Sequence, residues 1–573
     1  MILDDLKTFI GAAESFDIPD KLMACLLDND KRIKLFDKVC ENVDLTKDGL
    51  RDLFQNELAQ RSNLKQDYTP DCICEIVSKI IPEDAEIAAD ICSGTGSLTV
   101  ANGNRFNYDC EELSGMSLPM LILNLAVRGL NASVAQRDVL KRETHKAYKL
   151  TNDGKYSRIE VLEKYEPRKA DVVISNPPYS MKYEIEEDER FDGYDMPPKT
   201  KADYAFVLDG LSRLSENGTA VYILPHGVLF RGAAEGKIRK KLIENNLLDA
   251  VIGLPEKLFL NTGIPVCIVV LKKKRQNNDV FIADASRLSD KSGKQNIMTA
   301  EHIEKVSEAY KSRRTVEKFS KCVEISEIIE NDYNLNIPRY VDTSEKEPVP
   351  DLKTTIDEIN DISCEIQKTE NEIAEMMKQL VGTTDETEKY YRECAYMFLD
   401  YTREQKEKYD GLDGIGDIAE EVGKAETKEI KFLDAATIQR ARKGEIYPQG
   451  SILLQVSATK GQTLILNENS EVDGKYAVIE PKNMDSEYFY LLMQNALPDF
   501  LRRYKTGLNI NPEIFKYLKL TYHVDERIQK LAVRAAKALD DFTEYEEREI
   551  TEFKKFKAWH LDMMFVNSDR ERG

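Results

Sequence analysis

The sequence predicts an α/β protein whose first half holds a parallel sheet and whose second half holds a strand-containing module between two long helices. Two observations support this. Between residues 68 and 285, short apolar runs alternate with helical segments, the pattern of a parallel sheet covered by helices on both faces. Beyond residue 340, apolar residues recur every seven positions, which predicts a helix with a coiled-coil seam.

Composition narrows the class of protein. The 573 residues suggest three or four domains of about 150 residues each. With 42% hydrophobic and 32% charged residues, the chain can bury several cores, so wholesale disorder is excluded. No apolar run approaches the length of a membrane helix, and the first residues lack the order of a secretory signal. Ten cysteines without a CxxC pair, and only five histidines, predict reduced thiols, a cytoplasmic protein and no metal site.

The elements of the first half follow from apolar periodicity. Residues 1–65 resemble a short region of amphipathic helices, and residues 66–340 form the α/β domain. The predicted strands of this domain are Ile87–Cys92, Val172–Ser175, Ala220–Leu224, Ala250–Gly253, Val266–Leu271 and Val280–Ala283. The predicted helices between them are 112–129, 203–215 and 234–246. Ligands of such sheets bind at the carboxyl ends of the strands.

The second half begins with a helical spacer at 341–410. Its seam residues are Leu352, Ile359, Ile366, Ile373 and Leu380, and the expected partner helix lies in the closing segment, 523–573. Between the two helices, residues 411–522 are rich in β-branched residues and glycine, with predicted strands at Ser451–Val456, Thr463–Leu466 and Tyr476–Ile479.

A glycine turn and three acids follow predicted strands in the α/β domain. Asp90 ends an apolar run and is followed by Gly94-Thr95-Gly96, a turn that lets a ligand approach backbone N–H groups closely. Glu112, expected to begin a helix, lies 22 residues after Asp90, about the spacing at which a nucleotide-binding fold places the acid for ribose hydroxyls. Asp138 closes the next candidate strand. Each acid alone is more typical of a helix cap or a surface group.

The most specific motif is Asn176-Pro177-Pro178-Tyr179, directly after an apolar strand. The prolines stiffen the turn and fix the direction of the asparagine side chain and nearby carbonyls. Tyr179 adds a flat ring beside a planar amide. This arrangement can hold an exocyclic amino group through two acceptors while its ring is stacked. A proline-terminated strand with a core tyrosine is the simpler alternative.

These motifs resemble the amino-methylating DNA adenine methyltransferases, specifically the modification (M) subunits of type I restriction systems. The resemblance covers residues 66–340 and implies a Rossmann-like S-adenosylmethionine-dependent methyltransferase. It implies a catalytic set of Asn176, Pro177 and Tyr179. The implied cofactor-binding residues are Tyr68, Thr69, Pro70, Asp90, Gly94, Thr95, Gly96, Glu112, Asp138 and Asn176.

The implied reaction is transfer of a methyl group to N6 of an adenine flipped out of double-stranded DNA. Residues 341–573 are similar to part of a type I specificity (S) subunit, which implies that 411–522 recognise the DNA target. Basic clusters could contact phosphate there and elsewhere. They are Arg231 with Lys237–Lys241, Lys272–Arg275, Arg440–Lys443 and Arg502–Lys505.

Several alternatives remain open from the sequence. The same tetrapeptide could serve an RNA base or a protein glutamine. The chain could act only with separate specificity or restriction subunits, as a homodimer or alone, and its C-terminal half could be an assembly arm. A non-catalytic scaffold is a further alternative, although such a protein has no need of the intact tetrapeptide and three acids.

Overall fold

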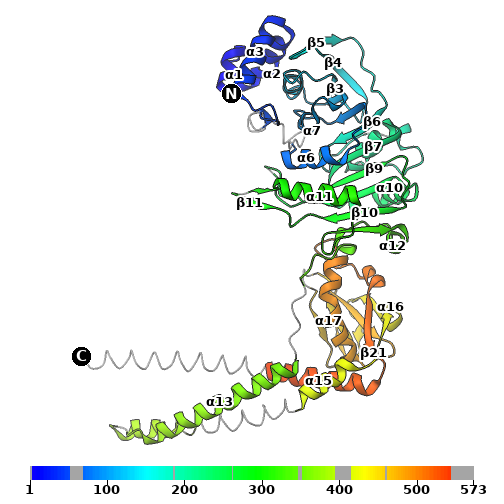
Figure 1. The fold of residues 1–573 in the computed structure, drawn as a ribbon. Helices are drawn as coiled ribbons and strands as arrows, with labels where there is room; N and C mark the ends of the chain where they lie inside the picture. Colours follow the sequence, from blue (N-terminus) through cyan, green and yellow to red (C-terminus); the bar gives the residue numbers. More distant parts are fainter. Residues whose placement is uncertain are drawn as a thin grey trace. The chain divides into compact units, whose positions relative to one another are not determined.

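The computed structural model describes residues 3–51, 69–184, 188–260, 262–293, 295–345, 352–381, 383–393, 396, 414–457 and 461–543. The chain divides into two compact units, Met1–Ser344 and Glu345–Gly573 (Figure 1). Each unit is described by itself.

In the described part of the first unit, eleven strands form one mixed sheet, in the order β13-β10-β8-β9-β7-β6-β1-β2-β3-β4-β5. Their bounds, in chain order, are β1 Ile87–Ile91, β2 Asn107–Glu112, β3 Ala132–Asp138, β4 Glu143–Asn152, β5 Ser157–Leu162, β6 Ala170–Ser175, β7 Leu214–Pro225, β8 Leu248–Gly253, β9 Val266–Lys272, β10 Asp279–Asp284 and β13 Ser320–Glu324. A separate hairpin joins β11 (Asp290–Ser292) to β12 (Gln295–Ile297).

The sheet is parallel in two parts. Strands β7, β6, β1, β2 and β3 run parallel to one another, and β8 runs parallel to β10. By contrast, β9 is antiparallel to both β7 and β8, β4 is antiparallel to β3 and β5, and β13 is antiparallel to β10. The prediction of a parallel sheet was therefore wrong for β9, β4, β5 and β13. The sequence of a seven-residue apolar strand such as β9 does not indicate whether it pairs parallel or antiparallel. Burial on both faces removes the alternation of apolar and polar residues that marks many antiparallel strands.

Helices cover both faces of the sheet. Alternate residues of β1 enter different cores: Ala88 packs with one layer of helices and Ala89 with the other, as the two-residue period of a strand requires. On the first face lie α6 (Asp71–Ile80), α7 (Ser97–Asn102), α8 (Leu118–Ala126) and α11 (Ala300–Ser312), with α6 and α11 side by side (Figure 1). On the second face lie α9 (Asp203–Arg213), α10 (Ala233–Glu244) and α12 (Ile325–Glu330). Short 3-10 turns are η2 Gly103–Arg105, η3 Glu189–Phe191, η4 His226–Leu229 and η5 Ile337–Arg339.

The N-terminal helices belong to the same unit. They are α1 (Leu3–Ile10), η1 (Ser15–Asp17), α2 (Ile18–Leu27) and α3 (Asn29–Asn42). Every residue of α8 is buried, so this helix needs cover on its outer side as well as against the sheet. Helix α2 packs on α8 and supplies that cover. The ring of Phe36 in α3 meets Tyr156 edge-to-face, with ring centroids 5.1 Å apart.

Two local predictions were wrong. Residues 112–129 are not one helix: Glu112 ends strand β2, and α8 begins only at Leu118. The polar composition of β2, Asn-Tyr-Asp-Cys-Glu-Glu, concealed a strand whose last five residues are buried. The β4–β5 hairpin was also missed, because its partly exposed strands carry too few apolar residues to stand out.

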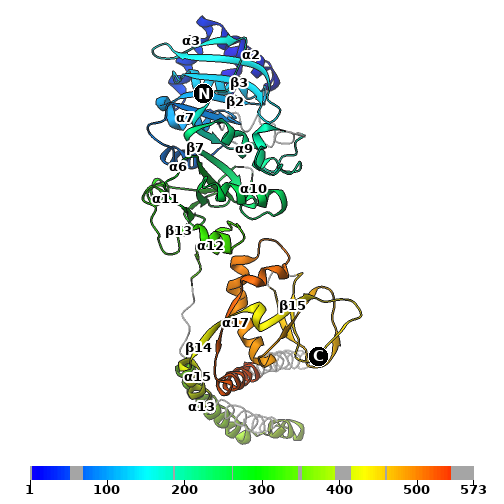
Figure 2. The same ribbon diagram turned by 90° about the vertical axis from the view of Figure 1, so that its right-hand side faces the viewer.

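The second unit contains a small sheet packed against a long helix. Strands β15 (Ala436–Arg440), β20 (Tyr476–Pro481), β17 (Ile452–Gln455) and β18 (Thr463–Ile465) form an antiparallel sheet in that order. Helix α17 (Ser486–Tyr504) lies against it (Figure 2), with Phe489 and Phe500 in the shared core. The remaining elements are α15 Ile415–Lys424, β14 Thr427–Lys431, α16 Phe432–Ala435, β16 Ile446–Tyr447, β19 Ser470–Glu471, η7 Pro512–Tyr517 and β21 Lys519–His523.

The long helix α13 spans Leu352–Gln379. Near its start, Ile356 packs with Ile415 of α15 and with Ala535, which lies in the helical residues 526–543. Further along, Ile366 and Leu380 of the predicted seam are 40% and 48% exposed. Residues 544–573 of the expected partner helix lie outside the described part, so the coiled coil stays a prediction. No described helix of the chain is both long enough and apolar enough to cross a membrane.

Candidate functional site

The candidate site lies at the carboxyl edge of four neighbouring strands, β6, β1, β2 and β3. These strands are parallel, so all four end at the same edge of the sheet. The edge therefore collects a residue from each strand or from the turn after it: Asn176, Asp90, Glu112 and Asp138. A cleft opens there, with a volume of about 920 Å³ when the solvent at its mouth is counted.

Asp90, near the end of β1, is fully buried and is not among the residues that line the cleft. Its Oδ2 accepts a hydrogen bond of 2.6 Å from the Thr99 hydroxyl, whereas its Oδ1 is buried and has no hydrogen-bond partner among the described residues. Burial raises the pKa of Asp90 to about 7, and the nearby charge of Glu112 acts in the same direction. An unpaired buried oxygen is costly, so this position suits a donor supplied by a ligand.

The glycine loop after β1 needs its glycines for two different reasons. Gly94 has φ +59° and its N–H donates to Glu112 Oε2 at 2.8 Å. Gly96 has φ +88°, and a Cβ there would lie 2.8 Å from Leu121 Cδ1 of α8, so it allows close packing of α7 on α8. Thr95 is 1% exposed and its hydroxyl donates to Asp48 at 3.1 Å. Gly94 thus lines the cleft, while Thr95 and Gly96 shape the loop from behind.

Glu112 joins the ends of β1 and β2. Its Oε2 accepts from Gly94 N–H and its Oε1 accepts from Ser114 N–H, each at 2.8 Å. The side chain is 6% exposed and lines the cleft. Each carboxylate oxygen accepts more than one hydrogen bond, so Glu112 keeps capacity for hydroxyl groups of a ligand.

Asp138 stabilises the turn after β3. Its Oδ1 accepts from the N–H groups of Leu140 and Lys141, both at 3.0 Å. It lines the cleft beside Val139. Asp138 therefore both caps the turn after β3 and lines the cleft.

The tetrapeptide Asn176–Tyr179 forms the wall opposite Glu112. The Asn176 amide nitrogen donates to Thr69 Oγ1 at 3.1 Å, and its Oδ1 accepts from the Tyr179 hydroxyl at 2.7 Å. These two bonds fix the plane of the amide. The Tyr179 ring meets Phe259 edge-to-face, with ring centroids 6.2 Å apart. The amide and the ring are thus held side by side before any target is bound.

The chain after the tetrapeptide is also anchored. Ser180 has φ +49° and its N–H donates to Asp203 Oδ1 at 2.8 Å. Asp203 is fully buried and pairs with Arg231 at 2.8 Å, and Arg231 pairs with Glu235 at 2.9 Å. Arg231 of the first basic cluster therefore supports the Asn176–Tyr179 turn from within the unit.

Most of the predicted residues meet at the cleft. Those that line it are Thr69, Gly94, Glu112, Asp138, Asn176, Pro177 and Tyr179. Of the other predicted residues, Pro70, Asp90, Thr95 and Gly96 are not in the lining, and Tyr68 lies outside the described residues. Cys92, Ser93 and Pro178, which stand inside the two motifs, also line the cleft. Sequence reasoning missed the rest of the lining, namely Ser97, Leu98, Glu111, Leu113, Arg137, Val139, Met181 and Phe206. These residues have no motif of their own and come together only in the fold.

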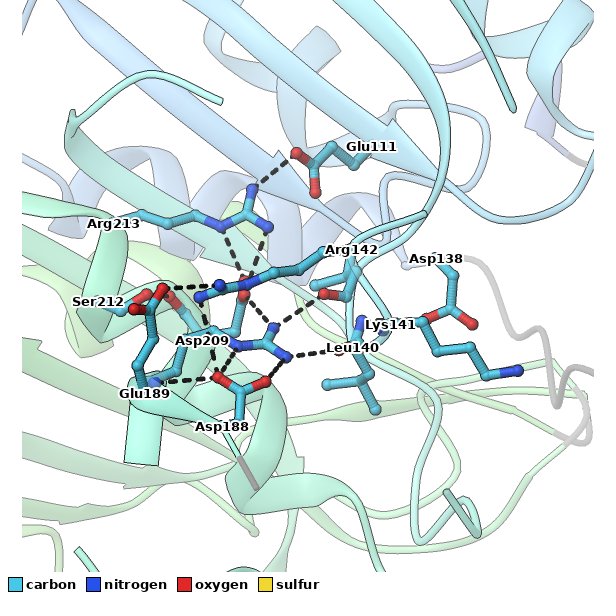
Figure 3. A network of polar contacts seen from close by, with 12 residues as sticks. Glu111, Asp138, Leu140, Lys141, Arg142, Asp188, Glu189, Asp209, Ser212 and Arg213 are labelled. Atoms are coloured by element: carbon cyan, nitrogen blue, oxygen red, sulfur yellow. Dashed lines mark hydrogen bonds and ion pairs between the residues drawn. The ribbon is translucent and has the colours of Figure 1, made fainter. Parts of the chain in front are cut away.

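Behind the cleft lies a buried network of charged residues (Figure 3). Glu111 is fully buried and accepts from Arg213 at 2.7 Å and from the Tyr165 hydroxyl at 2.8 Å. Asp209 pairs with Arg213 at 2.8 Å and with Arg190 at 2.6 Å. Of the adjacent acids Glu111 and Glu112, the first thus serves the network and the second is bonded to the glycine loop.

The network ties the segment after the tetrapeptide to the turn after β3. Arg190 has a side chain only 1% exposed and donates to the carbonyls of Val139 and Leu140. It also pairs with Asp188. Because Val139 lines the cleft, this arginine fixes one wall from outside.

These residues fit S-adenosylmethionine, which carries an ammonium group, a ribose and an adenine. The buried, unpaired Oδ1 of Asp90 matches a donor, the carboxylate of Glu112 matches hydroxyl groups, and Leu113, Val139 and Phe206 offer apolar surface for a ring. Among the described residues, no group of three or more His, Cys, Asp and Glu side chains could hold a metal ion.

The basic clusters of the first unit are largely neutralised within it. Lys237 pairs with Asp195 at 3.1 Å, Lys274 with Glu216 at 2.9 Å, and Arg275 with Asp249 at 3.1 Å. In the second unit, by contrast, Arg440, Arg442 and Lys443 are exposed and none of them forms an ion pair with another described residue. Of the basic residues predicted to contact phosphate, these three, at the end of β15 and just after it, are exposed and not engaged in such ion pairs.

The sequence profile of a family described as N-6 DNA Methylase matches residues 52–348, about half of the chain. This match includes the complete cleft. The chain belongs to the N-6 DNA methylase family.

Relatives within and near this family share the same region. The chain is 30% identical over 338 residues to the type I restriction enzyme MpnII methylase subunit of Mycoplasma pneumoniae, covering 54% of this chain and 60% of the relative. It is 29% identical over 342 residues to the MjaVIII methylase subunit of Methanocaldococcus jannaschii, covering 56% of each. The chain thus spans less than two thirds of these relatives' length. A solved type I methyltransferase subunit from Streptococcus thermophilus is 38% identical, with a TM-score of 0.43 over 48% of this chain and 59% of that one.

The buried network of this N-6 DNA methylase predicts a large stability effect at Asp209. Asp209→Ala removes the carboxylate shared by Arg190 and Arg213, and breaking a buried ion pair costs about 3–5 kcal/mol. Glu189→Ala is the matched control, because Glu189 is 76% exposed and pairs with Arg142 at the surface, where such pairs contribute at most about 1 kcal/mol. Urea unfolding followed by circular dichroism measures both. A loss below about 1 kcal/mol for Asp209→Ala would contradict the assigned role.

Proposed function

We propose that this chain transfers the methyl group of S-adenosylmethionine to N6 of an adenine flipped out of double-stranded DNA, as the modification component of a restriction–modification system. The observation that carries the proposal is the Asn176 amide. It is held by Thr69 and Tyr179 on the wall of a cleft that also contains Gly94 and Glu112. The family match and the similarity to type I methylase subunits support the reaction and its setting.

Different residues of the first unit bind different parts of the cofactor. Glu112 accepts hydrogen bonds from ribose hydroxyls while it holds Gly94 in place. Asp90 receives the ammonium group at its unpaired oxygen, and Tyr68, Thr69 and Pro70 are proposed for the same end of the cofactor. Asp138 and Val139 border the adenine. Bound S-adenosylmethionine supplies a methyl group that is already activated by its positive sulfur.

The tetrapeptide then orients the target. Adenine N6 cannot be reached inside a duplex, so the base must leave the stack. Asn176 Oδ1 and the Pro177 carbonyl accept its two N–H groups, which directs the nitrogen lone pair toward the methyl group. Tyr179 stacks on the ring and recovers about 1–3 kcal/mol of lost stacking. The amino nitrogen gains the methyl group as the bond between that group and the cofactor's sulfur breaks, which leaves the demethylated cofactor, and the methylated nitrogen loses one proton to water. Positioning and electrostatics supply most of the rate enhancement, so no separate base is proposed.

The Tyr179 hydroxyl occupies the Asn176 acceptor in the structure, at 2.7 Å. A carbonyl oxygen has two lone pairs, so the incoming N–H group either shares the oxygen or replaces the tyrosine. In both cases the amide is already aligned when the base arrives. This pre-organisation lowers the entropy cost of reaching the reactive geometry.

DNA is favoured over RNA or a glutamine side chain by the second unit. One pocket reads one base, so a specific site needs side chains that read neighbouring bases in a groove. We assign this role to the sheet and helix between residues 414 and 523. The exposed Arg440, Arg442 and Lys443 are suited to phosphate contacts. A homodimer would then read a split, inverted site, and separate restriction subunits would perform cleavage.

A second candidate function is that of a modification subunit active only with a separate specificity subunit. The relatives bear the name of methylase subunits, and this name favours the candidate. The second unit would then be an assembly arm. The two candidates differ in whether this chain alone methylates a defined DNA site.

Asn176→Ala tests the reaction itself. The amide acts on the target amino group, so its loss should lower the single-turnover rate by at least about 100-fold. The dissociation constant for S-adenosylmethionine should change by less than about threefold. The rate is measured with labelled cofactor, and the affinity by calorimetry. Methyl transfer at the normal rate would refute the catalytic assignment.

The raised pKa of Asp90 predicts how the affinity for S-adenosylmethionine depends on pH. Its pKa is raised to about 7, so the free protein carries the proton at pH 6, whereas binding an ammonium group requires the carboxylate. Cofactor affinity should therefore fall about tenfold from pH 8 to pH 6. Asp90→Asn should bind more weakly at pH 8 and lack this dependence, which also corrects for titration of the cofactor. Equal pH profiles for both proteins would contradict the assignment.

If Arg440, Arg442 and Lys443 contact DNA phosphates, they contribute to the salt dependence of DNA binding. Replacing Arg440, Arg442 and Lys443 by alanine should reduce the slope of log K against log salt by about 2–3, because each phosphate contact contributes about 0.9. Lys237→Ala with Lys274→Ala is the control, since both lysines are paired within the first unit. An unchanged slope in the triple variant would place the DNA on another surface.

A further inference from the structure

A short segment of the N-terminal region is built into the rear of the cleft. Asp48 lies beyond helix α3 and is 5% exposed. Its carboxylate accepts hydrogen bonds from Ser97 Oγ at 2.6 Å, Thr95 Oγ1 at 3.1 Å and Asn124 Nδ2 at 2.8 Å. Thr95 and Ser97 flank Gly96 in the glycine loop. The loop is therefore held from behind by an acid that no sequence motif marks.

Two of the three donors, Asn124 and Thr95, are also bonded to each other. Asn124 also donates to the Thr95 carbonyl at 2.8 Å, so Asp48, Asn124 and Thr95 form a closed set of bonds. Arg128 donates to Asn124 Oδ1 and to the carbonyls of Leu45 and Lys47, which fastens the segment to α8. A buried carboxylate is tolerated only when it is hydrogen-bonded in this way, so the contact is specific.

Arg51, in the same segment, contacts Thr69, which is bonded to Asn176 in another wall of the cleft. Its Nη1 donates to the Thr69 carbonyl at 3.1 Å and to Asp71 Oδ1 at 2.6 Å. Thr69 Oγ1 in turn accepts from the Asn176 amide nitrogen. Arg51 thus fixes the residue that orients the proposed catalytic amide.

We propose that Asp48 and Arg51 are positioning residues that set the two walls of the cleft from one four-residue segment. Asp48 positions the glycine loop and hence the cofactor, and Arg51 positions Asn176 through Thr69. The N-terminal helices, which cover α8, are then also the frame that fixes the distance between methyl donor and target. This inference rests on the proposed function, because it assigns cofactor and target to opposite walls.

The inference predicts a separation of kinetic effects. Asp48→Asn keeps the size of the side chain but removes the charge that three donors share, so the dissociation constant for S-adenosylmethionine should rise about ten- to a hundredfold. Its transfer rate at saturating cofactor should stay within about threefold. Arg51→Met should show the reverse, with nearly unchanged cofactor affinity and a transfer rate lowered about tenfold or more. Arg51→Lys should restore part of the rate, since it can still reach Asp71 or Thr69.

The test uses the full chain, with calorimetry for cofactor affinity, labelled-methyl transfer for the rate and thermal unfolding for stability. Asp44→Ala is the control, because Asp44 lies just before this segment, is exposed and accepts only from Thr46 among the described residues. If Asp48→Asn does not fold, Ser97→Ala removes the shortest of the three bonds and should raise the dissociation constant in the same direction.

Two outcomes would overturn the inference. One is a parallel loss of affinity, rate and stability in both variants, which indicates a general structural role. The other is unchanged cofactor affinity in Asp48→Asn. The proposed function fails separately: a wild-type chain that binds cofactor but methylates no DNA refutes the function, whereas an active wild type without the predicted separation refutes only the positioning roles.

Discussion

Parallel pairing of β6, β1, β2 and β3 is the constraint on which the rest of the site depends. In this ladder Asp90 is level with Cys110 of β2 and Ile174 of β6, so residues far apart in sequence end at one edge. If one of these strands ran the other way, its polar residue would lie at the opposite edge of the sheet. The antiparallel strands lie outside this group of four, where they extend the sheet without disturbing the cleft.

Polar groups around the cleft are buried and mostly paired, which makes the cleft rigid. Glu112, Asp138 and Asn176 each hold a neighbouring loop as well as facing the cleft. Behind them, Glu111, Asp209 and Asp48 bind groups from distant segments. Such networks are costly when only partly satisfied. Asp90 Oδ1 and Glu111 Oε2 are buried oxygens without a hydrogen-bond partner among the described residues, and the first is the one we propose for the ligand.

The sequence predicted the parts of this arrangement that are local. The run Val172–Ser175 predicted a strand, which is β6, and placed Asn176 at its end, where it lines the cleft. The run Ile87–Cys92 likewise predicted β1. The catalytic and cofactor-binding roles of these residues stay predictions. Glu112 was expected to begin a helix but ends β2, because a polar strand buried in a large domain has no periodic pattern. The direction of β9, the β4–β5 hairpin and the contact of Asp48 with Ser97 depend on tertiary pairing, which leaves no local trace in the sequence.

Charge is distributed to match two different tasks. The net charge is −21. Most side chains of the basic clusters in the first unit pair with acids of the same unit, and some of these pairs support the walls of the cleft. Arg440, Arg442 and Lys443 are exposed and form no ion pair with another described residue, so they suit the contacts with a polyanion that we propose.

Transfer of the methyl group to adenine N6 in DNA is the proposal on which the assigned roles depend. It is tested most directly by incubating the purified chain with duplex DNA and isotopically labelled S-adenosylmethionine, digesting the DNA to nucleosides and identifying the product by mass spectrometry. The account predicts label in N6-methyladenine within one sequence context. Label in cytosine, in RNA or in a glutamine peptide, with none in adenine, would contradict it.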